Sequence, residues 1–152
     1  MVRKRLLGLP ETARAPRAAY APARSERVYT TLGTQAAAAV RTTGGAIVDA
    51  TFGTTAARAA FTRGLDACGA PVLVAECRAP AALLEARAAA RARGAKGASD
   101  ATPAVVRRHL AAWEPLVEIP SHRHLLVSTE RPPEAVADHV LGWLDRRLEA
   151  RA

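Results

Sequence analysis

The stretch Ala46-Ile47-Val48-Asp49-Ala50-Thr51-Phe52 decides the expected fold class. A short apolar run that leads into an aspartate is typical of a buried parallel strand, so we expect a strand over residues 46–51. Glycines lie on both sides of the run and mark the expected ends of the strand. In an open α/β sheet the carboxyl ends of the strands border the ligand crevice. Asp49 is therefore either a functional carboxylate or a cap of the helix that follows.

The rest of the chain alternates between strand-like and helix-like patterns. Two further strands are expected over residues 72–77 and 124–128. Helices are expected over residues 3–9, 25–42, 55–67, 81–93, 102–113 and 134–149. Ser25 and Thr54 are the expected N-caps of the second and third helices. This alternation predicts an α/β fold in three layers around a parallel sheet.

The composition fits one globular domain, which we expect to span residues 1–152. Hydrophobic residues make up 49% of the chain, but many are alanines, so the core is expected to be thin. The two cysteines, Cys68 and Cys77, lie in no metal-binding motif. No stretch has the length of a membrane span. We therefore expect a cytoplasmic protein with no membrane partner.

The chain is basic, with a formal charge of +8 from 22 Lys and Arg against 14 Asp and Glu. All but two of these cations are arginines. Arginine suits bidentate binding of phosphate, but a GC-rich genome also encodes many arginines. The basic residues are scattered among acidic ones, and no recognition helix or aromatic platform accompanies them. This pattern argues against nucleic acid as the partner.

Several short motifs occur in an order that resembles one group of P-loop proteins. They are Val2-Arg3-Lys4-Arg5-Leu6, the Tyr20 and Tyr29 pair, Val48-Asp49-Ala50-Thr51-Phe52, Glu76-Cys77-Arg78-Ala79-Pro80 and Ser99-Asp100-Ala101-Thr102. This order is similar to that in the AAA-family ATPase or kinase domains related to zeta toxin, chloramphenicol phosphotransferase and polynucleotide kinase. Such domains often form the second half of bifunctional aminoglycoside-phosphotransferase/ATP-binding proteins, so a fused or partner domain of that kind is expected.

The resemblance covers almost the whole chain and implies a P-loop NTPase-like fold. The implied activity is ATP-dependent phosphoryl transfer to a small-molecule or hydroxyl acceptor. ATP and Mg²⁺ are the implied cofactors. The alternatives are a basic module that binds nucleic acid or a partner protein, and a pseudo-kinase remnant.

The sequence departs from this family at the phosphate-binding loop. The family begins with a strand, a GxxxxGK[ST] loop and a helix, followed by a strand that ends in a Ser-Asp-x-x-Arg-like motif. No such loop occurs here, and residues 94–99 lack its spacing. Arg3 would match the arginine of the second motif, and Met1 would be an internal codon. We therefore expect an incomplete fold that lacks the first two strands and the loop, with no kinase activity of its own.

The resemblance also assigns candidate site residues. Asp49 would be the catalytic carboxylate that faces Mg²⁺ or its waters. Arg3 and Arg58 would bind the acceptor or its phosphate. The loop over residues 10–25 is either a segment that covers the substrate or a linker.

The helix expected over residues 81–93 contains two arginines four positions apart, Arg87 and Arg91. Four positions place them on one helical face. By resemblance they belong to a lid that closes over the nucleotide, and Asp100 ends that lid. The alternative is the solvated face of an arginine-rich helix. Arg107 and Arg108 are expected at the surface, and His122 and His124 are expected to be structural.

Overall fold

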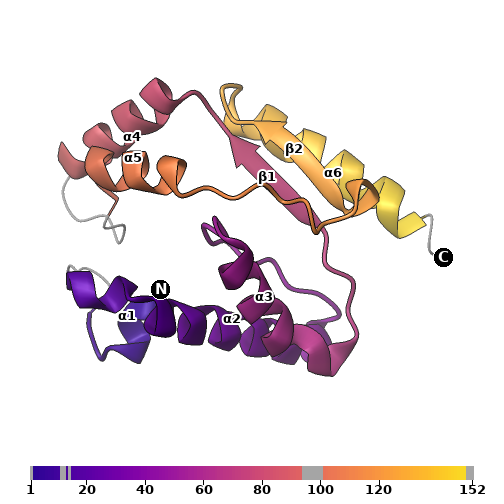
Figure 1. Cartoon of the computed structure of the whole chain (residues 1–152). Helices are drawn as coiled ribbons and strands as arrows, with labels where there is room; N and C mark the ends of the chain where they lie inside the picture. The colour runs from indigo at the N-terminus through magenta and orange to yellow at the C-terminus, as the bar shows by residue number, and fades with distance from the viewer. Residues whose placement is uncertain (1, 11–12, 14, 94–100, 150–152) are drawn as a thin grey trace. The chain divides into compact units, whose positions relative to one another are not determined.

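The computed structural model describes residues 2–10, 13, 15–93 and 101–149 of the chain. In chain order the elements are α1 (Val2–Leu6), η1 (Arg17–Tyr20), α2 (Pro22–Thr43), α3 (Thr55–Leu65), η2 (Asp66–Cys68), β1 (Val74–Arg78), α4 (Ala81–Arg93), α5 (Pro103–Ala111), η3 (Ser121–Arg123), β2 (His124–Ser128) and α6 (Pro133–Glu149) (Figure 1). They divide into two units, and each is described by itself. The first comprises Met1–Ala70 with Glu85–Pro115, and the second comprises Pro71–Leu84 with Leu116–Ala152.

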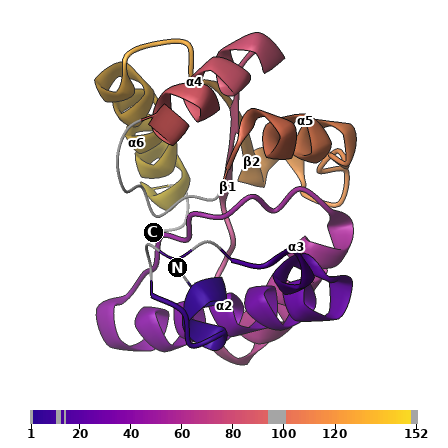
Figure 2. The ribbon, with the colours of Figure 1, turned by 90° about the vertical axis from the view of Figure 1, so that its left-hand side faces the viewer.

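The first unit is built on the packing of α2 against α3 (Figure 2). Two glycines let the helix backbones touch. A Cβ atom on Gly33 would lie 2.1 Å from the carbonyl oxygen of Phe61, and one on Gly64 would lie 2.2 Å from that of Thr30. The buried side chains of this pair are mostly small: Val28, Ala36, Ala37, Ala57, Ala60, Phe61 and Leu65. The core is therefore thin in side chains and depends on close backbone contact.

The caps of these helices confirm one prediction and correct another. Thr54 caps α3 as predicted, since its hydroxyl accepts a hydrogen bond from the Ala57 N–H at 3.2 Å. The prediction of Ser25 as the cap of α2 is wrong, because the helix begins three residues earlier, at Pro22 after Ala21. Proline suits the first helical position, where it has the required φ and lacks an N–H that would stay unpaired.

The strand predicted over residues 46–51 is absent from the structure. Among the described residues, strand pairing joins β1 and β2, and residues 45–53 carry no regular secondary structure. Ile47 is 99% exposed. The apolar pattern of this stretch shows that it suits a buried strand, but a strand forms only where a neighbour pairs with its backbone N–H and C=O groups. The structure confirms an α/β arrangement with a small parallel sheet, and the three-layer architecture stays a prediction.

The second unit contains that sheet. β1 and β2 are parallel, with Val74 opposite His124 and Arg78 opposite Ser128. The prediction of β2 is confirmed at both ends, and β1 lies within two residues of its predicted position. α6 packs on β2, and Val127 and Trp143 are buried.

Candidate functional site

A cleft of about 1320 Å³ lies within the first unit. Its walls come from α1, the segment around η1, the first half of α2, residues 49–54 and α5. The polar side chains that line it are Arg3, Lys4, Tyr20, Ser25, Tyr29, Asp49, Thr51, Thr54, Arg108 and His109. A cleft of this size can hold a nucleotide-sized or smaller organic ligand.

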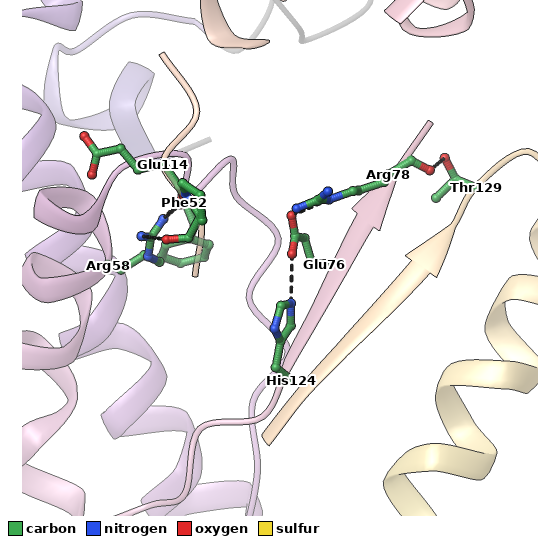
Figure 3. A network of polar contacts seen from close by, with 8 residues as sticks. Phe52, Arg58, Glu76, Arg78, Glu114, His124 and Thr129 are labelled. Carbon is green, nitrogen blue, oxygen red and sulfur yellow. Dashed lines mark hydrogen bonds and ion pairs between the residues drawn. The ribbon is translucent and has the colours of Figure 1, made fainter. Parts of the chain in front are cut away.

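Arg58 on α3 ties together two distant segments beside this cleft. Its side chain is buried, with the residue 7% exposed. It donates hydrogen bonds to the carbonyl oxygens of Phe52 at 2.9 Å and Glu114 at 3.2 Å (Figure 3). It also donates to the Pro115 carbonyl and to the Thr55 hydroxyl, both at 3.1 Å. A guanidinium supplies five N–H donors, which suits this role. Arg58 therefore fixes the chain after α5 against the start of α3.

Glu114 makes the same connection from the other side. Its N–H donates to the Gly53 carbonyl at 2.9 Å, and its carboxylate accepts a hydrogen bond from the Thr55 N–H at 2.7 Å. The ring of Trp113 covers Gly53, where an added Cβ atom would lie 3.3 Å from the ring. These contacts hold the end of α5 beside residues 52–55, and so place the α5 side chains along the cleft.

Phe52 takes an unusual backbone conformation between Thr51 and Gly53, which line the cleft. Its φ angle is +46°, which side chains other than glycine rarely adopt. Its ring lies between those of Tyr29, at 5.2 Å, and Phe61, at 5.1 Å. Burial raises the pKa of the Tyr29 hydroxyl, although a backbone hydrogen bond with Phe52 and the charge of Arg3 lower it. Tyr29 therefore presents a protonated hydroxyl to the cleft at neutral pH.

Arg3 enters the cleft from α1 in a fixed orientation. It donates hydrogen bonds to the Ala19 carbonyl and, at 3.4 Å, to the Ser25 hydroxyl. Its guanidinium carbon lies 4.5 Å from the centre of the Tyr20 ring. Stacking on an aromatic face is a favourable arrangement for arginine.

On the opposite wall, α5 contributes Arg108 and His109. The helix is capped by Thr102, whose hydroxyl accepts a hydrogen bond from the Val105 N–H at 3.4 Å. Burial lowers the pKa of His109, and the charges of Arg108 and Arg3 lower it further. Both guanidinium groups therefore act on the imidazole, which is neutral at pH 7.

The structure brings only some of the predicted site residues together. Arg3 and Asp49, 46 positions apart in the chain, line the same cleft. Arg58 lies outside that lining, and its role toward an acceptor stays a prediction.

The residues predicted for a lid lie elsewhere. Arg87 is half-buried on α4 and Arg91 is exposed, and neither lines the cleft. Asp100 lies outside the described residues. The lid role of these three residues stays a prediction.

The sequence analysis missed Arg108 and His109 as members of the site. Arg108 is exposed, as expected, but it faces the cleft. The sequence of the predicted helix did not indicate that Arg108 lines a cleft, because the residues of the facing wall lie about a hundred positions earlier in the chain.

The carboxylates of the described residues do not gather into a metal site. Mg²⁺ is commonly held by one or two carboxylates together with substrate phosphates. Within the described residues, no three His, Cys, Asp or Glu side chains gather as metal ligands, and Asp49 is the carboxylate that lines the cleft. The sequence also contains no GxxxxGK[ST] run, the pattern typical of a loop that cradles a triphosphate.

The second unit contains a separate polar cluster on its sheet. Glu76 on β1 is buried, at 4% exposure. Its carboxylate accepts a hydrogen bond from Arg78 Nε at 2.7 Å, and its other oxygen lies 2.8 Å from His124 Nε2 (Figure 3). His124 therefore pairs with a carboxylate within the sheet, as its expected structural role requires.

Comparison with known proteins assigns the chain to a protein family. Residues 1–116 match the model of a family described as an AAA domain, and the chain belongs to this family of P-loop NTPase-like domains. Membership indicates a nucleotide-binding, kinase-like or ATPase-like function, with Mg²⁺ as the usual metal of the class. No curated protein and no solved structure matched the chain. In the part of the chain that the structure describes, no helix is long and apolar enough to cross a membrane.

Proposed function

We propose that this chain is the acceptor-binding part of a kinase-like domain that transfers a phosphoryl group from ATP to a hydroxyl-bearing small molecule. The proposal rests on the cleft of the first unit, together with the membership of the chain in the AAA domain family. It gathers two residues that the resemblance to zeta-toxin-like kinases assigns to catalysis and acceptor binding, Asp49 and Arg3. The hydroxyl groups of Tyr29 and Ser25 beside them suit a polyhydroxylated ligand.

The proposal includes a phosphate-binding loop that is encoded ahead of residue 1. The 152 residues contain no GxxxxGK[ST] run. Residues 46–51 have the composition of a buried strand, yet Ile47 is 99% exposed. Both features are explained if the missing strand pairs with this segment and presents its loop near Asp49. The lid roles of Arg87, Arg91 and Asp100 over the nucleotide belong to the same proposal.

The first test is thermal unfolding of the 152-residue protein with and without Mg²⁺-ATP. We expect no upward shift of Tm beyond the shift that sodium sulfate causes at the same ionic strength. A ligand that binds only the folded state at a hundredfold excess over its Kd adds about 2.7 kcal/mol of stability, so binding would be visible. An upward shift larger than the one caused by sodium sulfate would show that these residues hold the nucleotide, which would contradict the missing-loop part of the proposal.

The second test is the coding sequence upstream of Met1. An in-frame stretch that encodes a strand, a GxxxxGK[ST] loop and a helix is expected. The extended protein should then bind Mg²⁺-ATP and release ADP when a suitable acceptor is added, and Asp49→Asn should abolish the release while leaving the fold intact. A stop codon close to Met1 would contradict this origin of the loop.

A further inference from the structure

We propose that the cleft binds an acceptor through an oxyanion group, a phosphate, sulfate or carboxylate, held by Arg3, Arg108 and His109, which line it together. This inference rests on the proposed function only for the statement that the ligand is the acceptor. The binding of an oxyanion follows from the charges and geometry of the cleft.

The charges that line the cleft are mostly positive. Arg3, Lys4 and Arg108 are cationic, and among the described residues that line the cleft Asp49 is the one carboxylate. A cleft lined by one sign of charge focuses the electrostatic field and raises the local concentration of the opposite ion. An anionic ligand is therefore favoured, and a polycation such as an aminoglycoside is repelled.

Two of the positive charges lie close enough to one imidazole of the cleft to affect it. Arg3 comes from α1 and Arg108 from α5, and the charges of both act on the imidazole of His109. An oxyanion beside this imidazole would accept charge-assisted hydrogen bonds from two guanidinium groups. The same anion would relieve the mutual repulsion of these groups.

Arg3 is also held in place before any ligand arrives. Its hydrogen bonds to the Ala19 carbonyl and the Ser25 hydroxyl, and its stacking on Tyr20, restrict its side chain. A side chain that is already ordered loses less conformational entropy on binding. A guanidinium held in one orientation can offer its N–H groups to an oxyanion.

The probe that tests this inference is sodium sulfate, which remains a dianion from pH 5.5 to 7.5. The ionic strength is kept constant with sodium chloride, and binding is followed by the NMR signals of the arginine Nε–H groups and the His109 ring. We expect saturable shifts at Arg3, Arg108 and His109.

Two variants make the measurement specific. Arg108→Gln removes a cation from the cleft and should weaken sulfate binding at least fivefold. Arg41→Gln removes the same charge from the exposed last turn of α2, away from the cleft, and should leave the affinity unchanged. Shifts that do not saturate, or an equal loss in both variants, would overturn the inference.

The pH dependence gives an independent readout. The ionisable groups that line the cleft with His109 are Arg3, Lys4, Tyr20, Tyr29, Asp49 and Arg108. A bound dianion favours the imidazolium, so by linkage the affinity for sulfate should rise as the pH falls from 7.5 to 5.5. His109→Gln should remove this rise. A rise that persists in His109→Gln would overturn the assignment of His109 to the site.

The experiment uses no nucleotide, so it fails or succeeds independently of the proposed function. Absence of sulfate binding, with ATP turnover retained by the extended protein, would overturn only the oxyanion inference. Sulfate binding in a protein whose extended form never binds ATP would overturn only the proposed function.

Discussion

At the scale of single residues, Arg58 joins two segments beside the cleft although it does not line the cleft. It is buried and donates to three backbone carbonyls from two distant segments. Arg58→Met would remove the hydrogen bonds that this buried side chain makes to both segments, so we expect a loss of about 2–3 kcal/mol in the free energy of unfolding. Arg63→Met is the matched control on the same helix, because Arg63 forms only an exposed ion pair with Glu26 at 2.6 Å. Urea unfolding measures both, and equal losses would contradict this role of Arg58.

The lowered pKa of His109 predicts how the free energy of unfolding depends on pH. Its pKa is lowered in the folded chain from the ordinary value of 6.5, so the unfolded chain takes up a proton at a higher pH than the folded chain. The stability that the neutral imidazole contributes is therefore complete above about pH 6.5 and is lost as the pH falls toward the folded pKa. His109→Gln should flatten this part of the curve of Tm against pH. His139→Gln, on exposed α6 surface, should keep the slope.

Asp49 should oppose the binding of an anion in the same cleft. Removing its charge lowers the repulsion, so Asp49→Asn is expected to tighten sulfate binding severalfold at neutral pH. Because the side chain is exposed, the substitution should leave Tm within about 1 °C of the original. Unchanged or weaker binding in Asp49→Asn would show that the carboxylate lies away from the anion.

At the scale of elements, the crossing of α2 and α3 depends on its glycines. A Cβ atom at Gly33 would lie 2.1 Å from the backbone oxygen of Phe61, and the backbone cannot move aside without separating the helices. We expect Gly33→Ala to cost about 3 kcal/mol of stability. Gly142→Ala on α6 meets only the end of the Arg146 side chain, at 3.5 Å, and should stabilise by up to about 1 kcal/mol. Thermal unfolding distinguishes the two, and a neutral Gly33→Ala would contradict the close crossing.

These elements also show which features a sequence can predict. The cap at Thr54, the end of α2 at Gly44 and the bounds of α4 depend on local chemistry, and the structure agrees with them. The helix crossing at Gly33 and the cleft position of His109 depend on contacts between distant segments. No local pattern encodes such contacts, so neither feature could be predicted.

At the scale of the whole molecule, the exposed stretch 46–51 links the fold to the proposed function. Its sequence predicts a strand, and in the structure it has no strand partner among the described residues. If a strand encoded ahead of residue 1 pairs with it, its amides should be protected from hydrogen exchange only in the extended protein. In the 152-residue chain we expect them to exchange much faster than the paired amides of β1.

Exchange followed by mass spectrometry of peptides that cover residues 46–52 and 74–78 measures this difference within one sample. The β1 peptide serves as the internal control, because its pairing with β2 is present in both proteins. Protection of residues 46–52 that matches β1 already in the 152-residue chain would contradict the proposal, since the segment would then have a partner without the missing strand. Protection that appears only with the extension would show that the added chain pairs with or covers the exposed stretch around Ile47, as the proposal requires.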